Sequence, residues 1–259
     1  MINLKTAHEI DLMARAGTLL ASVLPPLREA SVPGVKTIEL DRIAERLIRE
    51  GGATPGFLGY HGYPRSICVS INDEAVHGIP GNRKVAAGDL VSLDLGLVLE
   101  GFWADVGITV GVGKISSEAE KLLKVTEEAL YVGIQKARPG GWLGDISSAI
   151  QKHVEASGFS VIRQFVGHGI GRQMHEDPQV PNFGTPGTPP RLKAGMTLAI
   201  EPMVNAGSHE VYVKPDGWTV MTADGRLSAY YEHTIAITAE GPRVLTLGAS
   251  EPSRLSIAL

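Results

Sequence analysis

Four carboxylates stand in apolar stretches of the sequence, where charged groups are rarely found. Asp94 and Asp105 lie in the run "LDLGLVLEGFWAD", Glu201 ends "MTLAIE", and Glu232 precedes "HTIAIT". Burying an unpaired carboxylate is costly, and these stretches contain no Lys or Arg that could neutralise one. Four buried acids need about four positive charges, which two divalent cations would supply. The acids therefore predict a metal centre.

A histidine offers a fifth ligand. His168 lies between glycines in "FVGHGIGRQMHEDP", so the backbone can approach a neighbour closely and the imidazole is uncrowded. An oxygen-rich set with one imidazole suits Mn, Fe, Co or Zn, and carboxylates can bridge two ions. The set as a whole predicts a dinuclear hydrolase.

The two aspartates are expected to share one face of a β-hairpin. Glu100-Gly101 is a turn signal between two β-prone runs. A turn there places Asp94 and Asp105 directly opposite each other or one diagonal apart. Each ligand candidate also has an ordinary explanation, such as a solvent-facing Asp or a turn His. The joint pattern is what favours the metal site.

The elements that must position these residues follow an order of two helices and then strands, twice over. The first helix begins at the capping box of Thr6 and Glu9, and we expect it to stop at Pro25-Pro26. The other expected helices run from about Thr37 to Gly51, from a cap at Ser117 and Glu120 to Pro139, and over 145–157. The expected strands cover 66–72, 89–99, 102–112, 197–202, 218–223 and 232–238. The repeated order predicts an α/β (α+β) fold of two related halves in a single domain over 1–259, with a frayed tail after about residue 247.

Composition narrows the class of protein. The 259 residues carry a net charge of -4 and 43% hydrophobic residues, which argues against non-specific nucleic-acid binding. The N-terminus lacks the pattern of a signal peptide, and no window is expected to reach the roughly 18 apolar residues of a membrane helix. The lone cysteine, Cys68, suits a reducing compartment. We therefore expect a cytoplasmic protein without a membrane partner.

Five motifs together carry a resemblance to a known family. They are "YHGYPRSICVSINDEAVHGIP", "LDLGLVLEGFWAD", "FVGHGIGRQMHEDPQVPNFG", "AIEPMV" and "DGWTV…SAYYEHTIAIT". The sequence resembles the bacterial type I methionine aminopeptidases, of the pita-bread (M24) metallopeptidases, from about residue 3 to 247. This resemblance implies a pita-bread fold, with two pseudo-twofold halves and a central curved antiparallel sheet flanked by helices. The sequence shows neither the inserted helical subdomain of type II enzymes nor a cysteine-rich N-terminal extension.

The resemblance also implies roles for the five candidate ligands. Asp105 and Glu232 match carboxylates that bridge two ions, His168 and Glu201 match ligands of one ion, and Asp94 matches a ligand of the other. The cofactors implied are two divalent ions drawn from Co, Mn, Fe, Zn and Ni, and a monovalent cation site is left open.

Catalytic roles follow from the same resemblance. A water shared by the two cations would attack the scissile carbonyl, and Glu201 would accept its proton and pass it to the leaving amine. His175 would donate a hydrogen bond to the oxyanion, while His77 would hold the peptide beyond the cut. Without the resemblance, each of these two histidines would be expected to have a structural role.

The implied methionine pocket combines aromatic rings and soft sulfur, which suit a thioether side chain. Phe57 and Met174 depart from the usual residues of the family, and so does Trp103-Ala104 beside Asp105. The departures at Phe57 and Met174 leave the tolerance of the pocket open, while Trp103-Ala104 changes the packing beside Asp105. The pocket positions are Phe57, Tyr60, Tyr63, Cys68, Met174 and Trp218.

The function implied is removal of the N-terminal methionine from new polypeptides, with a preference for a small second residue. The expected partners are N-terminal Met peptides and nascent chains, with transient ribosome contact, and the chain is expected to be a monomer. Two alternatives stay open: another pita-bread metallopeptidase of the Xaa-Pro aminopeptidase or prolidase kind, and a pita-bread binding protein without metals.

Overall fold

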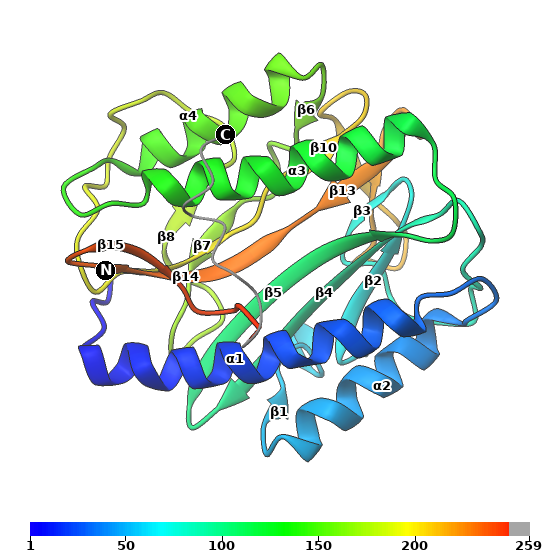
Figure 1. The fold of residues 1–259 in the computed structure, drawn as a ribbon, viewed down its shortest axis with the longest axis horizontal. Coiled ribbons are helices and arrows are strands. Elements are labelled where there is room, and N and C mark those ends of the chain that lie inside the picture. The colour runs from blue at the N-terminus through cyan, green and yellow to red at the C-terminus, as the bar shows by residue number, and fades with distance from the viewer. Residues whose placement is uncertain (249–259) are drawn as a thin grey trace.

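A curved antiparallel sheet forms the centre of the computed structural model, which describes residues 1–248 (Figure 1). Its main path runs β1-β4-β5-β14-β9-β7-β8, with β2 paired to β4 and β15 paired to β14. Apart from Leu247 and Gly248 at its start, the expected tail lies outside the described residues. The strands of this sheet are β1 (Thr54–Pro55), β2 (Ile67–Ile71), β4 (Leu90–Leu99), β5 (Phe102–Gly111), β7 (Gly167–Gly169), β8 (Glu176–Val180), β9 (Thr197–Ile200), β14 (Glu232–Thr238) and β15 (Gly241–Val244).

Beside the main sheet, the described residues form two small sheets and one short 3-10 helix. The strands of both small sheets pair antiparallel. The first small sheet contains β6 (Ser160–Val161), β10 (Met203–Asn205) and β13 (Ser228–Tyr230), the second β3 (Glu74–Val76), β11 (Val211–Val213) and β12 (Val220–Thr222), and the 3-10 helix is η1 (Tyr60–Gly62).

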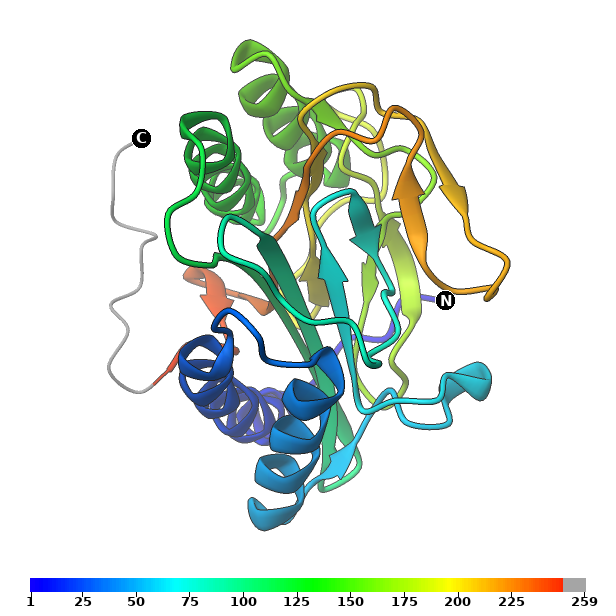
Figure 2. The ribbon, with the colours of Figure 1, turned by 90° about the vertical axis from the view of Figure 1, so that its right-hand side faces the viewer.

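Four helices cover one face of the main sheet, two over each half (Figure 2). α1 (Ala7–Ala30) and α2 (Thr37–Glu50) bury their apolar sides against β2, β4 and β5. α3 (Ser117–Lys136) and α4 (Leu143–Ala156) do the same over β9 and β14. This arrangement confirms the predicted order of two helices and then strands in each half.

The first helix is longer than predicted. Its capping box at Thr6 and Glu9 is present, but α1 continues through Pro25 and Pro26 to Ala30, so the predicted stop was wrong. Each proline removes a backbone donor, and burial of Leu24 and Leu27 on the far side offsets that loss. α1 is also long and apolar enough to cross a membrane by composition, with a mean hydropathy of 1.2, which corrects our expectation that no window qualifies. Half of that window is buried inside the protein, as in the core helix of a globular domain.

Two other helix starts differ slightly from prediction. The cap of α3 is Ser116, whose hydroxyl accepts from Ala119 N–H, so the cap lies one residue before the predicted Ser117. α4 begins at Leu143, two residues before the predicted start, because the Asp145 carboxylate accepts the Trp142 N–H and caps the first turn.

The β4–β5 hairpin has the predicted turn. Glu100 and Gly101 both have positive φ, at 51° and 80°, which is typical of the tight turn whose twist matches a hairpin. Asp94 pairs with Gly107, and Asp105 pairs with Gly96. The two aspartates therefore lie one diagonal apart on the same face.

The two halves meet where β5 pairs with β14. Only two residue pairs join these strands in the described structure, Glu232 with Gly107 and His233 with Val106. By contrast, β4 and β5 pair along their whole length.

Candidate metal centre

Neighbouring strands bring the five predicted ligands to one place on the face of the sheet opposite the helices. Asp94 and Asp105 come from the β4–β5 hairpin, Glu232 opens β14, Glu201 follows β9, and His168 is the middle residue of β7. These strands are adjacent in the order β4-β5-β14-β9-β7. Residues far apart in sequence thus converge because their strands pair.

A glycine makes room at the centre of this face. Gly107 lies between Asp94 on one neighbouring strand and Glu232 on the other. A Cβ at this position would come within 2.1 Å of the Tyr230 ring. The Tyr230 hydroxyl in turn donates a hydrogen bond to the Glu232 carboxylate.

The ligand atoms are close enough to share cations. One atom each of Asp105, His168 and Glu232 lies within 4.8 Å of the others. Glu201 Oε1 is 3.5 Å from His168 Nε2. Asp94 and Glu201 join Asp105 and His168 around a cavity of about 100 Å³.

The protonation of His168 fits metal binding. Its Nδ1 is 2.9 Å from the Gly169 carbonyl oxygen, which can only accept, so Nδ1 carries the proton. Burial lowers the pKa of His168 to about 4, so the ring is neutral near pH 7 and Nε2 holds a lone pair. That lone pair faces the carboxylate of Glu201. An ionised Glu201 and this lone pair repel unless a proton or a cation lies between them.

The carboxylates show the same mismatch. Asp94 Oδ1, Asp105 Oδ1 and Glu232 Oε1 are buried without a hydrogen-bond partner, and they are three of the five such side-chain atoms in residues 1–248. Burial raises the pKa of Asp94 to about 7. Burial and the neighbouring acids raise the pKa values of Asp105, Glu201 and Glu232 well above their usual range. The residues therefore fit divalent cations, which would satisfy the oxygens and favour their charged forms.

Hydrogen bonds from the neighbouring strands hold this cluster in place. Thr234 Oγ1 accepts the Asp105 N–H at 3.0 Å and donates to the Asp105 carbonyl at 2.8 Å, which joins β5 to β14. Asn182 donates to the Glu201 carbonyl at 2.9 Å. Such outer contacts orient metal ligands.

The two predicted non-ligand histidines line the same cavity. The His175 ring centre lies 4.2 Å from that of His168, and its Nδ1 is 2.7 Å from the Tyr60 hydroxyl. His77 adopts a positive φ of 58°, a strained conformation for a histidine, and packs edge-on against Phe165. Burial lowers the pKa of His77 to about 4, so this ring is neutral near pH 7.

Five of the six predicted pocket residues form one buried apolar cluster beside the cavity. The Tyr63 and Trp218 rings contact edge to face at 5.0 Å. Tyr60 stands apart from the cluster, and its hydroxyl is bonded to His175 instead. Burial raises the pKa of the Cys68 thiol, which agrees with a packing role for it. The clustered residues are Phe57, Tyr63, Cys68, Met174 and Trp218.

Some residues of this site were not predicted. Ile79 packs against the apolar cluster, and it belongs to the same "VHGIP" motif as His77, which was the available signal. Phe165 and Tyr230 line the cavity, and their proximity follows only from strand pairing.

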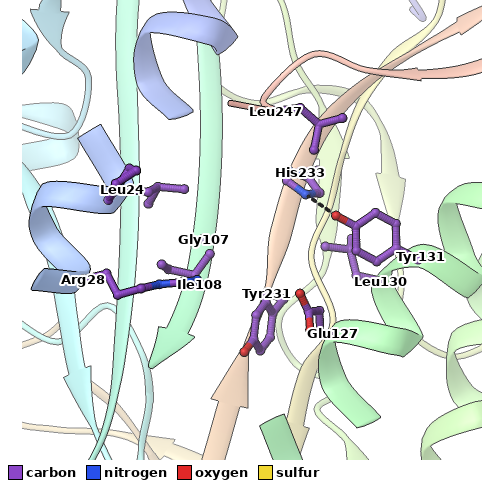
Figure 3. Close-up of a pocket in the computed structure, with 11 residues that line it drawn as sticks. Leu24, Arg28, Gly107, Ile108, Glu127, Leu130, Tyr131, Tyr231, His233 and Leu247 are labelled. Atoms are coloured by element: carbon purple, nitrogen blue, oxygen red, sulfur yellow. Dashed lines mark hydrogen bonds between the residues drawn. The ribbon is translucent and has the colours of Figure 1, made fainter. Parts of the chain in front are cut away.

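A second cavity of about 220 Å³ lies on the opposite face of the sheet, between α1 and α3 (Figure 3). Arg28 reaches it from α1, and Glu127 and Tyr131 from α3. His233, the neighbour of Glu232 in sequence, bonds the Tyr131 hydroxyl at 3.1 Å and Thr246 Oγ1 at 2.9 Å. None of the predicted site residues lines this cavity, which lies behind the seam between the halves.

A curved sheet carrying four buried carboxylates and one imidazole around a cavity is the arrangement of a metal-dependent hydrolase. The chain belongs to the metallopeptidase family M24, which its sequence matches over residues 11–239.

Individual relatives match nearly the whole chain. A methionine aminopeptidase of Clostridium perfringens is 57% identical over 247 residues, which cover 95% of this chain and 99% of that protein. The crystal structure of methionine aminopeptidase from Thermotoga maritima is 46% identical with a TM-score of 0.94, and the match covers 95% of this chain and 100% of the other. A Xaa-Pro dipeptidase from Bacillus anthracis shares the fold at 23% identity, with a TM-score of 0.77, over 96% of this chain and 62% of that one. The predicted pita-bread fold is thereby confirmed.

Proposed function

We propose that this chain is an aminopeptidase that removes the N-terminal methionine from newly made polypeptides. The observation that carries the proposal is a group of acids with unsatisfied buried oxygens and one histidine, beside a packed cluster of aromatic and sulfur side chains. The high identity to methionine aminopeptidases over almost the full chain supports it. We place this activity in the cytoplasm, on peptides and on nascent chains near the ribosome, in a single domain that acts as a monomer.

Two divalent cations would complete the site. Asp105 and Glu232 lie centrally and would contact both, His168 and Glu201 would hold one, and Asp94 the other. When bound, they would lower the pKa of a water molecule and polarise the scissile carbonyl. Co, Mn, Fe, Zn and Ni all suit this donor set, and the monovalent cation site stays a prediction.

The chain's own groups then position the substrate and move protons. The cluster of Phe57, Cys68 and Met174 would receive the methionine side chain and exclude water from it. Glu201 lines the cavity and would take a proton from the attacking water and pass it to the leaving amine. His77, neutral and held by Phe165, would contact the peptide beyond the cut.

His175 would stabilise the oxyanion through its Nε2. Tyr60 would donate its hydroxyl proton to His175 Nδ1, which leaves the ring proton on Nε2. Burial lowers the pKa of His175, which favours this neutral form. A fixed donor of this kind is worth most when it is already oriented before reaction.

The substrate assay tests the proposed function and the alternative peptidase. We expect Met-Ala-Ser to be cleaved at least about tenfold faster, as kcat/KM, than Met-Trp-Ser, because His77 and Phe165 leave little room beside the cavity. Purified protein with added Mn²⁺ or Co²⁺ is assayed by release of free methionine. Equal rates for the two peptides would contradict the selectivity, and turnover of Ala-Pro-Ser alone would identify a proline-directed enzyme.

Tyr60→Phe tests the orientation of His175. We expect kcat to fall about tenfold, since one hydrogen bond that fixes the tautomer is lost while the ring stays. The control is Tyr212→Phe, which removes a hydroxyl from an exposed side chain on β11. An unchanged kcat in Tyr60→Phe would show that the hydrogen bond does not prepare His175.

A further inference from the structure

A buried ion pair joins the N-terminal segment to the loop that carries His175. Lys5 Nζ contacts the Glu176 carboxylate, and both side chains are only 6% exposed. No other pair of a Lys or Arg with an acid in the described residues has both side chains below one-tenth exposed. Removing one member of such a pair leaves an uncompensated charge in the interior.

The backbone around Lys5 and Glu176 leaves space for their ion pair. Gly171 lies where a Cβ would come within 2.4 Å of Lys5 Cε and 2.7 Å of its Nζ, so a side chain here would displace the end of the lysine from its present position. The Lys5 N–H donates to the Gly195 carbonyl at 2.7 Å, which fixes the start of the lysine side chain. The position of the Lys5 side chain is therefore defined at its backbone and at its amino group.

The Glu176 carboxylate also accepts a hydrogen bond from the backbone of its own loop. Its Oε1 accepts the Gln173 N–H at 3.2 Å, while Oε2 contacts Lys5. The Gly171 N–H donates to the Gln173 carbonyl at 3.0 Å. The turn held by these bonds contains Met174, which packs on the methionine pocket, and His175, which faces the cavity.

We propose that Lys5 and Glu176 form a lock that positions His175 at the reaction site. Lys5 is thus a positioning residue, more than 160 residues distant in sequence from the histidine on which it acts. The inference rests on the proposed role of His175, and it assigns a function in catalysis to the N-terminal segment before α1.

Lys5→Met tests the lock. We expect kcat for Met-Ala-Ser to fall about 10- to 100-fold with KM nearly unchanged, because a small displacement of a catalytic group is costly. Lys5→Arg keeps the charge and should restore at least part of kcat. Arg243→Met is the matched control, since it removes an exposed ion pair with Asp11 and should leave kcat unchanged.

A double-variant comparison separates positioning from general damage. If Lys5 acts through His175, adding Lys5→Met to His175→Ala should lower kcat by no more than about twofold beyond His175→Ala alone. Multiplied losses would overturn the proposal. Should Lys5→Met fail to fold, Lys5→Met with Glu176→Met removes both charges together and should fold, but still show the reduced kcat.

A measurement independent of turnover distinguishes this proposal from the proposed function. In ¹⁵N-histidine-labelled protein, the His175 ring signals should shift in Lys5→Met and stay in place in Arg243→Met. Unchanged signals would overturn the lock whatever the activity. If the parent protein is inactive but the His175 signals shift as expected in Lys5→Met, the proposed function is contradicted and the lock is still supported.

Discussion

Asp105→Asn and Glu232→Gln are each expected to lower kcat/KM for Met-Ala-Ser by at least about 1,000-fold, which corresponds to several kcal/mol of lost stabilisation. Both carboxylates carry a buried oxygen without a partner, and both lie at the junction of β5 and β14. The amide variants keep the shape of the side chain but lose the charge that a divalent cation requires. Methionine release and Mn²⁺ binding by calorimetry are the measurements.

The control for these variants is Glu100→Gln at the tip of the same hairpin. Glu100 pairs with Arg15 at an exposed position, so its charge should matter little to activity. Circular dichroism should show that all three variants fold. Turnover close to that of the parent in Asp105→Asn or Glu232→Gln would contradict the ligand assignment, and a parent protein that binds no divalent cation would favour the metal-free binding module.

The second large effect concerns the metal-free protein, which should become less stable as pH rises from 6.5 to 8.5. The pKa values of Asp105, Glu201 and Glu232 are raised well above their usual range, so the folded chain keeps carboxyl protons to a higher pH than the unfolded chain does. Stability then falls with pH, by about 2.7 kcal/mol over two pH units for each proton retained. The melting temperature should drop by roughly 5–10 °C.

The buried histidines do not reverse this fall in stability with pH. His77 and His168 have pKa values lowered to about 4, so they stabilise the folded state above the unfolded value and lose that effect only as pH falls toward 4. The unfolded histidines are half protonated near pH 6.5 and lose most of their protons by about pH 7.5, above which the carboxylates set the slope. A melting temperature that stays flat or rises from pH 6.5 to 8.5 in chelator-treated protein would contradict the electrostatic description of the site.

Adding cations should reverse the loss. Mn²⁺ at about 100 times its Kd at pH 6.5 should raise the melting temperature by roughly 5–10 °C at that pH. The same Mn²⁺ concentration should raise it more at pH 8.5, since binding releases the retained protons. The Asp105→Asn variant should show little of this gain.

The parts of the structure that were predictable are those encoded locally. The β4–β5 hairpin follows from a turn signal and alternating side chains, and it alone places Asp94 and Asp105 on one face. The continuation of α1 through Pro25 was missed because packing in the core overrode a local rule. β7 and β8 lack apolar β-branched runs, and they are strands because they pair with each other and with β9.

Contacts between residues far apart in the sequence could not be predicted from sequence patterns. The hydroxyl of Tyr60 meets His175 across 115 positions, and Lys5 meets Glu176 across 171. Nothing in the spacing of either pair signals the contact. The apolar surroundings of the four acids and the glycines beside His168 indicated the five ligands, and the resemblance assigned their roles. The fold shows why they converge, but these supporting contacts emerge only in three dimensions.

The short pairing between β5 and β14 affects how the two halves of the molecule would open transiently. Each half is a cohesive unit with its own helices, while β5 and β14 share only two residue pairs. We expect partial opening to start along this line before either half unfolds. Asp105 and Glu232 lie on that line, so ions held by both would join the two halves, and ion occupancy would set how often the interior is exposed to proteases.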